Sequence, residues 1–140
     1  MRTAVKVAGV TVLALALWDL AWPLAGVRQV SPWMLKKRLD DVSPPLLLDV
    51  RTEAEYQWTR IPGAVHMPEL LLHPETLPGK FRDRDPVIIC MTGHRSPVTA
   101  YRLNRLFNMN ASNLTWGMTG WILSGGSTEQ RESTEKPARL

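Results

Sequence analysis

The 140-residue sequence has one cysteine, three histidines and no recognisable internal repeat. With a single cysteine no internal disulfide can form, so the cysteine count indicates neither an oxidising nor a reducing compartment. The histidines have no metal-ligand spacing relative to one another or to the cysteine, which argues against a zinc site. The sequence also lacks a glycine-rich phosphate loop and a basic run interleaved with aromatic residues. Nucleotides and nucleic acids are therefore not expected partners.

The length of the chain fits one domain with a hydrophobic core and an additional segment. Hydrophobic residues make up 44% of the chain and charged residues 21%, as in soluble folds. The formal net charge is +4 and the sequence pI is about 9.6. This balance predicts attraction to anions, either small ones or an anionic lipid surface.

Residues 1–27 differ from the rest of the chain. Arg2 and Lys6 precede an apolar stretch over residues 7–27 that is interrupted only by Asp19. A basic start followed by an apolar core is the layout of a signal peptide or a signal anchor. The stretch is long enough to cross a bilayer, with Asp19 as its single costly residue. Pro23 spoils the nearest small-residue cleavage site, so we expect a retained anchor, with a cleaved signal as the alternative.

The orientation of such an anchor follows from its flanking charges. Arg2 and Lys6 favour an inside N-terminus, which would put the domain on the periplasmic or outer side of the inner (cell) membrane. Arg28 and the basic cluster over residues 36–38 favour the opposite arrangement, with a cytoplasmic-facing domain. We expect a single-pass membrane protein with its domain outside. The alternatives are a cleaved signal with a periplasmic domain and a retained anchor with a cytoplasmic-facing domain.

The central stretch of the chain surrounds the cysteine. Residues 87–89 are β-branched and apolar and follow Pro86, which predicts a buried strand that ends at Cys90. Ser96 is a good N-cap and Pro97 suits a first helical position. Apolar residues then recur at helical spacing. Cys90 is therefore expected at the carboxyl end of a strand, in a loop that leads into a helix N-terminus.

That placement favours chemistry with anions. Free N–H groups and the positive end of the helix dipole stabilise negative charge, and a thiolate there is a nucleophile. A lone cysteine after an apolar run is more often inert, but the glycine, histidine and arginine that follow argue for a functional one. The candidate loop residues are Met91, Thr92, Gly93, His94, Arg95 and Ser96.

The elements around this stretch predict an α/β fold with a parallel sheet. The sequence predicts a short strand over residues 27–30, a helix that begins at Ser31-Pro32 and a buried strand over residues 46–50. Asp49 and Arg51 stand at the C-terminal end of that last strand, where open α/β sheets place their sites. Farther along, residues 108–113 are expected to form a polar turn and residues 114–116 the last strand. The glycines at residues 117, 120, 125 and 126 are expected to allow tight turns beside the Cys90 loop.

The residues singled out elsewhere in the chain are predicted to have structural roles. Glu53 and Glu55 are close enough in sequence to pair with Arg51 or Arg60. His66 is expected to be structural. Trp116 and Trp121 are predicted to be core or pocket wall. Residues 127–140 are polar and are predicted to be a disordered tail.

Residues 90–96, Cys-Met-Thr-Gly-His-Arg-Ser, resemble the Cys-x-x-Gly-x-Arg-Ser active-site loop of the rhodanese (sulfurtransferase) family. The resemblance includes Leu-Asp-Val-Arg at residues 48–51, Ile-Pro-Gly-Ala at 61–64 and the Trp121 region. It covers residues 28–126, one complete domain. Thr59-Arg60 and His66 depart from the family pattern, which usually has Gly-His and asparagine there.

The resemblance implies a rhodanese-like parallel sheet flanked by helices, here preceded by a hydrophobic helix. It also implies that Cys90 carries a sulfane sulfur as a persulfide, moved from an anionic donor such as thiosulfate to a thiol or cyanide. Arg95 is then the first candidate for binding the donor, and no metal or organic cofactor is needed. The family assigns Asp49 and Arg51 mainly a supporting role, with substrate contact by Arg51 as the alternative.

Two other functions fit parts of the pattern. A membrane-tethered partner-binding or persulfide-relay module would keep Cys90 but show little turnover with a free donor. A phosphatase or arsenate reductase would also use a cysteine and an arginine in an anion-binding loop. Those relatives carry one more residue between the two, whereas Cys90 to Arg95 has the sulfurtransferase length.

Overall fold

The computed structural model describes residues 2–130, and for residues 2–4 the backbone alone. The helices are α1 (Arg2–Leu24), α2 (Pro32–Leu39), α3 (Glu53–Trp58), α4 (Ser96–Phe107) and α5 (Gly117–Leu123). The strands are β1 (Arg28–Val30), β2 (Leu47–Asp49), β3 (Val65–His66), β4 (Val87–Ile89) and β5 (Ser112–Leu114). Three 3-10 turns, at Pro68–Leu71, Pro74–Thr76 and Gly79–Phe81, join β3 to β4.

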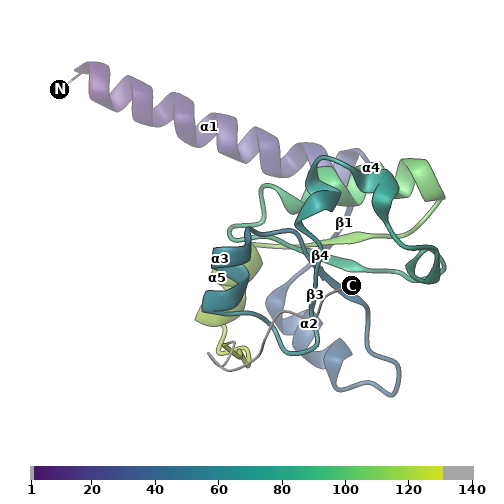
Figure 1. The fold of residues 1–140 in the computed structure, drawn as a ribbon. Coiled ribbons are helices and arrows are strands. Elements are labelled where there is room, and N and C mark those ends of the chain that lie inside the picture. Colours follow the sequence, from purple (N-terminus) through teal and green to yellow (C-terminus); the bar gives the residue numbers. More distant parts are fainter. Residues whose placement is uncertain (1, 131–140) are drawn as a thin grey trace.

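The strands form one parallel sheet in the order β1-β5-β4-β2-β3, with β4 in the centre (Figure 1). Side chains alternate between the two faces of β4. Ile88 joins a core that includes Ala100 and Leu103 of α4, while Ile89 joins a second core with Met118 and Trp121 of α5. Helices therefore cover both faces, and the predicted α/β fold with a helix-flanked parallel sheet is confirmed.

Helix α1 is joined to the sheet by a tight turn. Gly26 has φ +86°, and the amide of Val27 donates to the carbonyl of Trp22 at 2.9 Å, while the amide of Gly26 donates to Pro23 at 3.0 Å. These two bonds form a Schellman motif, which ends a helix and fixes the direction of the chain after it. Strand β1 begins two residues after Gly26, at Arg28.

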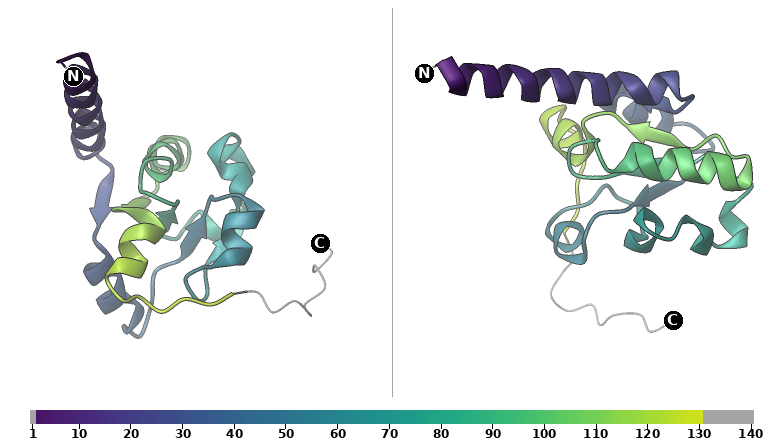
Figure 2. Two further views of the ribbon diagram at one scale, coloured as in Figure 1. Left: turned by 90° about the vertical axis from the view of Figure 1, so that its left-hand side faces the viewer. Right: turned by 90° about the horizontal axis from the view of Figure 1, so that it is seen from above.

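Most of α1 projects beyond the domain (Figures 1 and 2). Residues Val5–Leu24 are long and apolar enough to cross a membrane, and none of this stretch is buried within the protein. Near its C-terminal end, Trp22 packs against Tyr101 of α4, with 6.2 Å between ring centroids. The predicted N-terminal apolar helix is therefore present, and its last turns are packed on the domain.

Three local predictions need correction. Helix α4 begins at Ser96, with Arg95 and not Ser96 as its N-cap, because the Ser96 hydroxyl points down to buried polar partners. Strand β5 occupies Ser112–Leu114, so it begins two residues before the predicted strand over residues 114–116, since the Asn113 amide finds buried hydrogen-bond partners. The glycine-rich stretch after Trp116, expected to be a turn, is helix α5.

The start of the predicted tail is held against the domain. The backbones of Arg60 and Glu129 pair in an antiparallel bridge, and the Arg60 Nε lies 2.8 Å from Glu129 Oε1. The indole N–H of Trp121 donates to the carbonyl of Ser127 at 2.9 Å. The remainder of the predicted tail, residues 131–140, lies outside the described residues.

Candidate active site

Cys90 follows β4 directly and is fully buried. The amide of Gly93 donates to the Cys90 Sγ at 3.1 Å, and the Ser96 hydroxyl lies 3.1 Å from the same sulfur. Because α4 begins at Ser96, the sulfur also lies near the positive end of the α4 dipole. The loop thus surrounds the sulfur with groups that stabilise negative charge.

A polar chain leads from the sulfur to the edge of the sheet. The Ser96 Oγ lies 2.6 Å from Asn113 Oδ1, and the Asn113 amide nitrogen donates to Gln29 Oε1 at 2.7 Å. A hydroxyl has one proton, so Ser96 donates either to Asn113 or to the sulfur. When it donates to Asn113, its oxygen can still accept a proton from a Cys90 thiol.

The start of α5 packs against the backbone of the loop and fixes it by hydrogen bonds. The amides of Met118 and Thr119 donate to the carbonyls of Cys90 and Met91, each at 2.9 Å. Gly117 has φ +52°, and a Cβ there would lie 2.2 Å from the Cys90 carbonyl oxygen. A Cβ on Gly93 would lie 2.7 Å from the amide nitrogen of Trp116. Only glycine permits this close approach at both positions.

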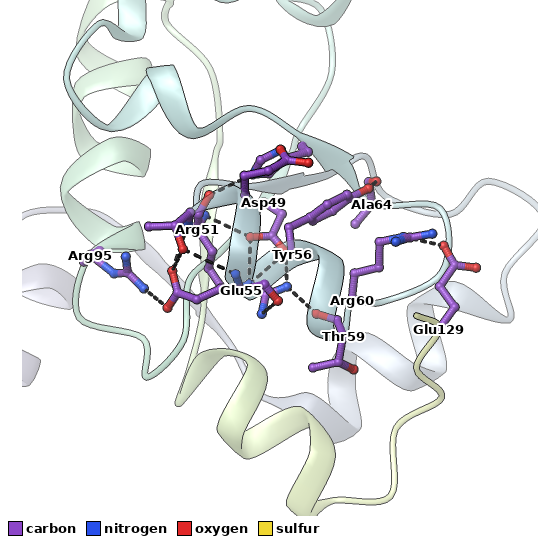
Figure 3. Close-up of polar contacts among 12 residues, drawn as sticks. Asp49, Arg51, Glu55, Tyr56, Thr59, Arg60, Ala64, Arg95 and Glu129 are labelled. Atoms are coloured by element: carbon purple, nitrogen blue, oxygen red, sulfur yellow. Dashed lines mark hydrogen bonds and ion pairs between the residues drawn. The ribbon is translucent and has the colours of Figure 1, made fainter. Parts of the chain in front are cut away.

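Arg51 forms a fully buried ion pair with Asp49 (Figure 3). Its Nη2 lies 2.7 Å from Asp49 Oδ2 and also donates to the carbonyl of Thr59 at 2.7 Å, while its Nη1 donates to the carbonyl of Glu55 at 3.0 Å. The guanidinium thus ties the end of β2 to the middle of α3 and to its C-cap, Thr59. Because the side chain is fully buried, Arg51 is part of the scaffold that joins β2 to α3.

Arg95 pairs with Glu55 at 2.7 Å, and both side chains are partly exposed (Figure 3). Glu55 also accepts from the amide and hydroxyl of Thr52 in a capping box at the start of α3. Burial alone would raise the pKa of Glu55, but the hydrogen bonds from Arg95 and Thr52 outweigh it and lower the pKa to about 2. The hydrogen bond that Arg95 donates to Glu55 in turn raises the pKa of Arg95, with a smaller contribution from Cys90.

These pairings correct the sequence-based expectation for Glu55. Its carboxylate pairs with Arg95 and not with Arg51 or Arg60, while Arg60 pairs with Glu129. His66 stacks on Tyr56, with 4.3 Å between centroids, and its Nε2 lies 2.8 Å from the carbonyl oxygen of Arg51. This places His66 in the same scaffold.

The outer side of the loop faces the end of α1. His94 Nδ1 lies 2.9 Å from the Thr92 hydroxyl, and His94 Nε2 lies 3.6 Å from Asp19 Oδ1 on α1. Two cavities flank the loop, and both are lined by Thr92 and Trp116. One, of about 220 Å³, also reaches Asp19, Trp22 and Gly93. The other, of about 340 Å³, is almost entirely apolar and is lined by Trp33 and Leu123 as well.

Residues 31–124 match the Rhodanese-like domain family. A sulfurtransferase from Allochromatium vinosum is 34% identical over 100 residues, which cover 71% of this chain and 92% of that protein. The chain belongs to the rhodanese-like domain family. The match supports a role of this rhodanese-like domain in sulfur transfer.

Solved structures agree with this membership. A rhodanese-like domain protein from Staphylococcus aureus superposes with a TM-score of 0.65 at 27% identity, covering 76% of this chain and all of that one. A thiosulfate sulfurtransferase from Pseudomonas aeruginosa superposes with a TM-score of 0.68 at 26% identity, covering 84% of this chain but 23% of that one. The rhodanese-like fold therefore extends over most of the chain.

Of the candidate loop residues, Gly93 and Ser96 contact the Cys90 sulfur, while Arg95 pairs with Glu55. Thr92 and His94 contact each other on the outer side of the loop. Sequence reasoning missed Asn113 and the pairing of Glu55 with Arg95. Asn113 stood in a polar stretch typical of turns, and no local signal connects it to Ser96. The capping pattern Thr52-x-x-Glu55 could have identified Glu55 as a helix-start residue, but its contact with Arg95 depends on the tertiary fold.

Proposed function

We propose that this rhodanese-like domain is a sulfurtransferase that carries a sulfane sulfur on Cys90 as a persulfide. The observation that carries the proposal is the set of donors around the Cys90 sulfur, namely the Gly93 amide at 3.1 Å, the Ser96 hydroxyl at 3.1 Å and the start of α4. Such donors stabilise a sulfur anion both before and after it accepts a second sulfur. A thiosulfate-like donor fits the basic charge of the chain.

In the first step the Cys90 thiolate attacks the outer sulfur of thiosulfate. A new S–S bond forms to Cys90, the bond between the two thiosulfate sulfurs breaks, and sulfite leaves with that electron pair. The product is a Cys90 persulfide whose terminal sulfur carries the negative charge. Backbone amides of the loop then stabilise this charge without reorganisation, as in other preorganised anion sites.

In the second step a thiophilic acceptor attacks the terminal sulfur. With cyanide the products are thiocyanate and the regenerated Cys90 thiolate; with a thiolate acceptor the sulfur leaves as a persulfide of that acceptor. Covalent catalysis thus divides one transfer into two displacements. No electron or proton needs to come from outside the two substrates.

Arg95 is the side chain that we assign to the anionic end of the donor. Its side chain is 37% exposed, and a guanidinium has five N–H donors, of which the bond to Glu55 uses one. His94 and Thr92 lie on the outer side of the loop and are weaker candidates for the same contact. Asp49 and Arg51 support the loop from the scaffold.

The proposal is tested with the full chain in detergent by measuring thiocyanate formed from thiosulfate and cyanide. The native protein is expected to turn over, and the Cys90→Ser variant, which keeps the size and a hydrogen-bonding group, is expected to be inactive. Turnover that survives in Cys90→Ser would overturn the assignment of the nucleophile.

The complete burial of Cys90 favours a second candidate, a persulfide relay that needs a partner to open the loop. Such a module would accept sulfur from a donor protein but show little turnover with thiosulfate. Absence of thiocyanate formation together with persulfide transfer from a protein donor would support the relay over the free-donor enzyme.

We further propose that α1 is retained as a single-pass anchor in the cell membrane, with the domain on the outer side. The length and composition of Val5–Leu24 support anchoring, and Arg2 and Lys6 support an inside N-terminus. The intact mass of protein extracted from the membrane fraction tests retention, because cleavage of a signal would remove α1 from the mass. Protease digestion of intact spheroplasts tests the side, since an outer domain is digested and a cytoplasmic one is protected.

A further inference from the structure

We infer that the mouth of the Cys90 site is held against the lipid bilayer, with Trp33, Trp116 and Leu123 in contact with its interface. We call these three residues the apolar rim. They are 60%, 55% and 83% exposed and lie beside the loop, around the apolar cavity that Thr92 also lines. The inference rests on the proposed anchoring by α1 and adds the orientation of the site to it.

The first step is the fixed joint between α1 and the domain. The Schellman motif at Gly26 leads into β1 with no flexible linker. Val27 belongs to the core that contains Ile88, and Trp22 packs against that core. Trp22 also packs on Tyr101, and Asp19 lies 3.6 Å from His94. Because the turn at Gly26 and the contacts of Trp22 and Asp19 hold the end of α1 on the domain, the domain cannot swing freely about the helix axis.

The second step is the direction in which the site faces. Parallel strands end at one edge of the sheet, and Thr92, Trp116 and Trp33 follow the carboxyl ends of β4, β5 and β1. The projecting part of α1 extends toward the side on which α3 and α5 lie (Figures 1 and 2). The active-site edge therefore faces the side on which the bilayer around α1 would lie.

The third step is the length of the helix. The apolar stretch Val5–Leu24 has 20 residues, and at about 1.5 Å per residue it measures about 30 Å, the thickness of the hydrocarbon core. The whole stretch is needed to cross, yet Asp19 and Trp22 in its last turns contact the domain. These contacts draw the loop and the apolar rim to the level of the lipid headgroups.

The chemistry of the rim fits that position. Tryptophan is enriched at membrane interfaces, where its ring is in the apolar region and its N–H reaches water. Trp18 and Trp22 of α1 lie edge to face at 5.2 Å, and Trp33 and Trp116 at 6.3 Å, with the smaller cavity between Trp22 and Trp116. A donor or acceptor would then reach Cys90 along the membrane surface.

The test places a single fluorophore on the full chain in vesicles of phosphatidylcholine and phosphatidylglycerol that contain a headgroup spin-labelled lipid. In a Cys90→Ser background, cysteine is introduced by Trp33→Cys or Leu123→Cys at the rim. Val42→Cys is the matched control, because Val42 is fully exposed and lies in the loop before β2, at the opposite edge of the sheet. Val12→Cys reports insertion of α1 by quenching with an acyl-chain spin label.

We expect several-fold stronger headgroup quenching at residues 33 and 123 than at residue 42, together with acyl-chain quenching at residue 12. Quenching at residue 12 with equally weak signals at residues 33, 123 and 42 would overturn the orientation while leaving the anchor in place. That result would indicate that a protein or a second copy covers the rim. Loss of quenching at residue 12 would refute the anchor itself, and the inference with it.

Discussion

Two arginine–carboxylate pairs near Cys90 have the same separation but different surroundings. Arg51–Asp49 and Arg95–Glu55 both measure 2.7 Å, yet the first pair is fully buried, whereas the side chains of the second are 37% and 25% exposed. A buried charge must keep its partner, while a partly exposed guanidinium can bind a further anion. Burial and not distance therefore separates the arginine that holds the scaffold from the arginine assigned to the donor.

The largest effect is expected from breaking the buried pair. Arg51→Met leaves the Asp49 carboxylate buried without its partner, which should lower the free energy of unfolding by about 3–5 kcal/mol. Urea unfolding of the full chain in detergent measures the loss. The double variant Asp49→Leu/Arg51→Met should recover part of it, since no buried charge remains. Equal stability of Arg51→Met and the native protein would contradict the structural role.

A steric change at the loop should have the next largest effect, because it moves the loop without altering either pair. Gly117→Ala puts a Cβ against the Cys90 carbonyl oxygen at a positive φ. We expect a loss of about 2–4 kcal/mol in unfolding free energy from overpacking and left-handed strain, with loss of sulfurtransferase activity. Gly63→Ala, also at positive φ but with open space around it, is the control for strain alone. Similar activity losses in both variants would contradict the steric account.

Breaking the partly exposed pair should affect catalysis more than stability. Arg95→Gln removes a charged hydrogen bond to the donor, worth about 1.5–3 kcal/mol, so kcat/KM for thiosulfate should fall by about 10- to 100-fold. The unfolding free energy should change by no more than about 1 kcal/mol. A large loss of stability with unchanged kcat/KM would assign Arg95 to the scaffold beside Arg51.

The smallest effect concerns the pH dependence of the Arg95–Glu55 pair. The pKa of Glu55 is lowered to about 2 in the folded protein, against about 4.3 for an unperturbed glutamate. Its contribution to stability is thus fully present above the unfolded pKa and is lost as the pH falls through about 2. The stability difference between the native protein and Glu55→Gln should stay constant from neutral pH to about 5 and then shrink. A difference that disappears already at pH 5 would contradict the lowered pKa.

How much the sequence predicted depends on whether a signal is local. The strand before Cys90 and the parallel α/β fold follow from β-branched runs and turn residues close together in the chain. Asn113, the Glu55–Arg95 pair and the N-cap of α4 depend on contacts between distant segments, so propensity gave no indication of them. The helix α5 was missed because its glycines, which permit close packing under the loop, are typical of turns.

The central claim is that Cys90 accepts a sulfane sulfur, and intact mass spectrometry tests it most directly. The full chain is treated with thiosulfate beside a Cys90→Ser control. The account predicts a gain of one sulfur atom in the native protein, lost on adding cyanide and absent from the control. No gain in the native protein, or an equal gain in the control, would contradict it.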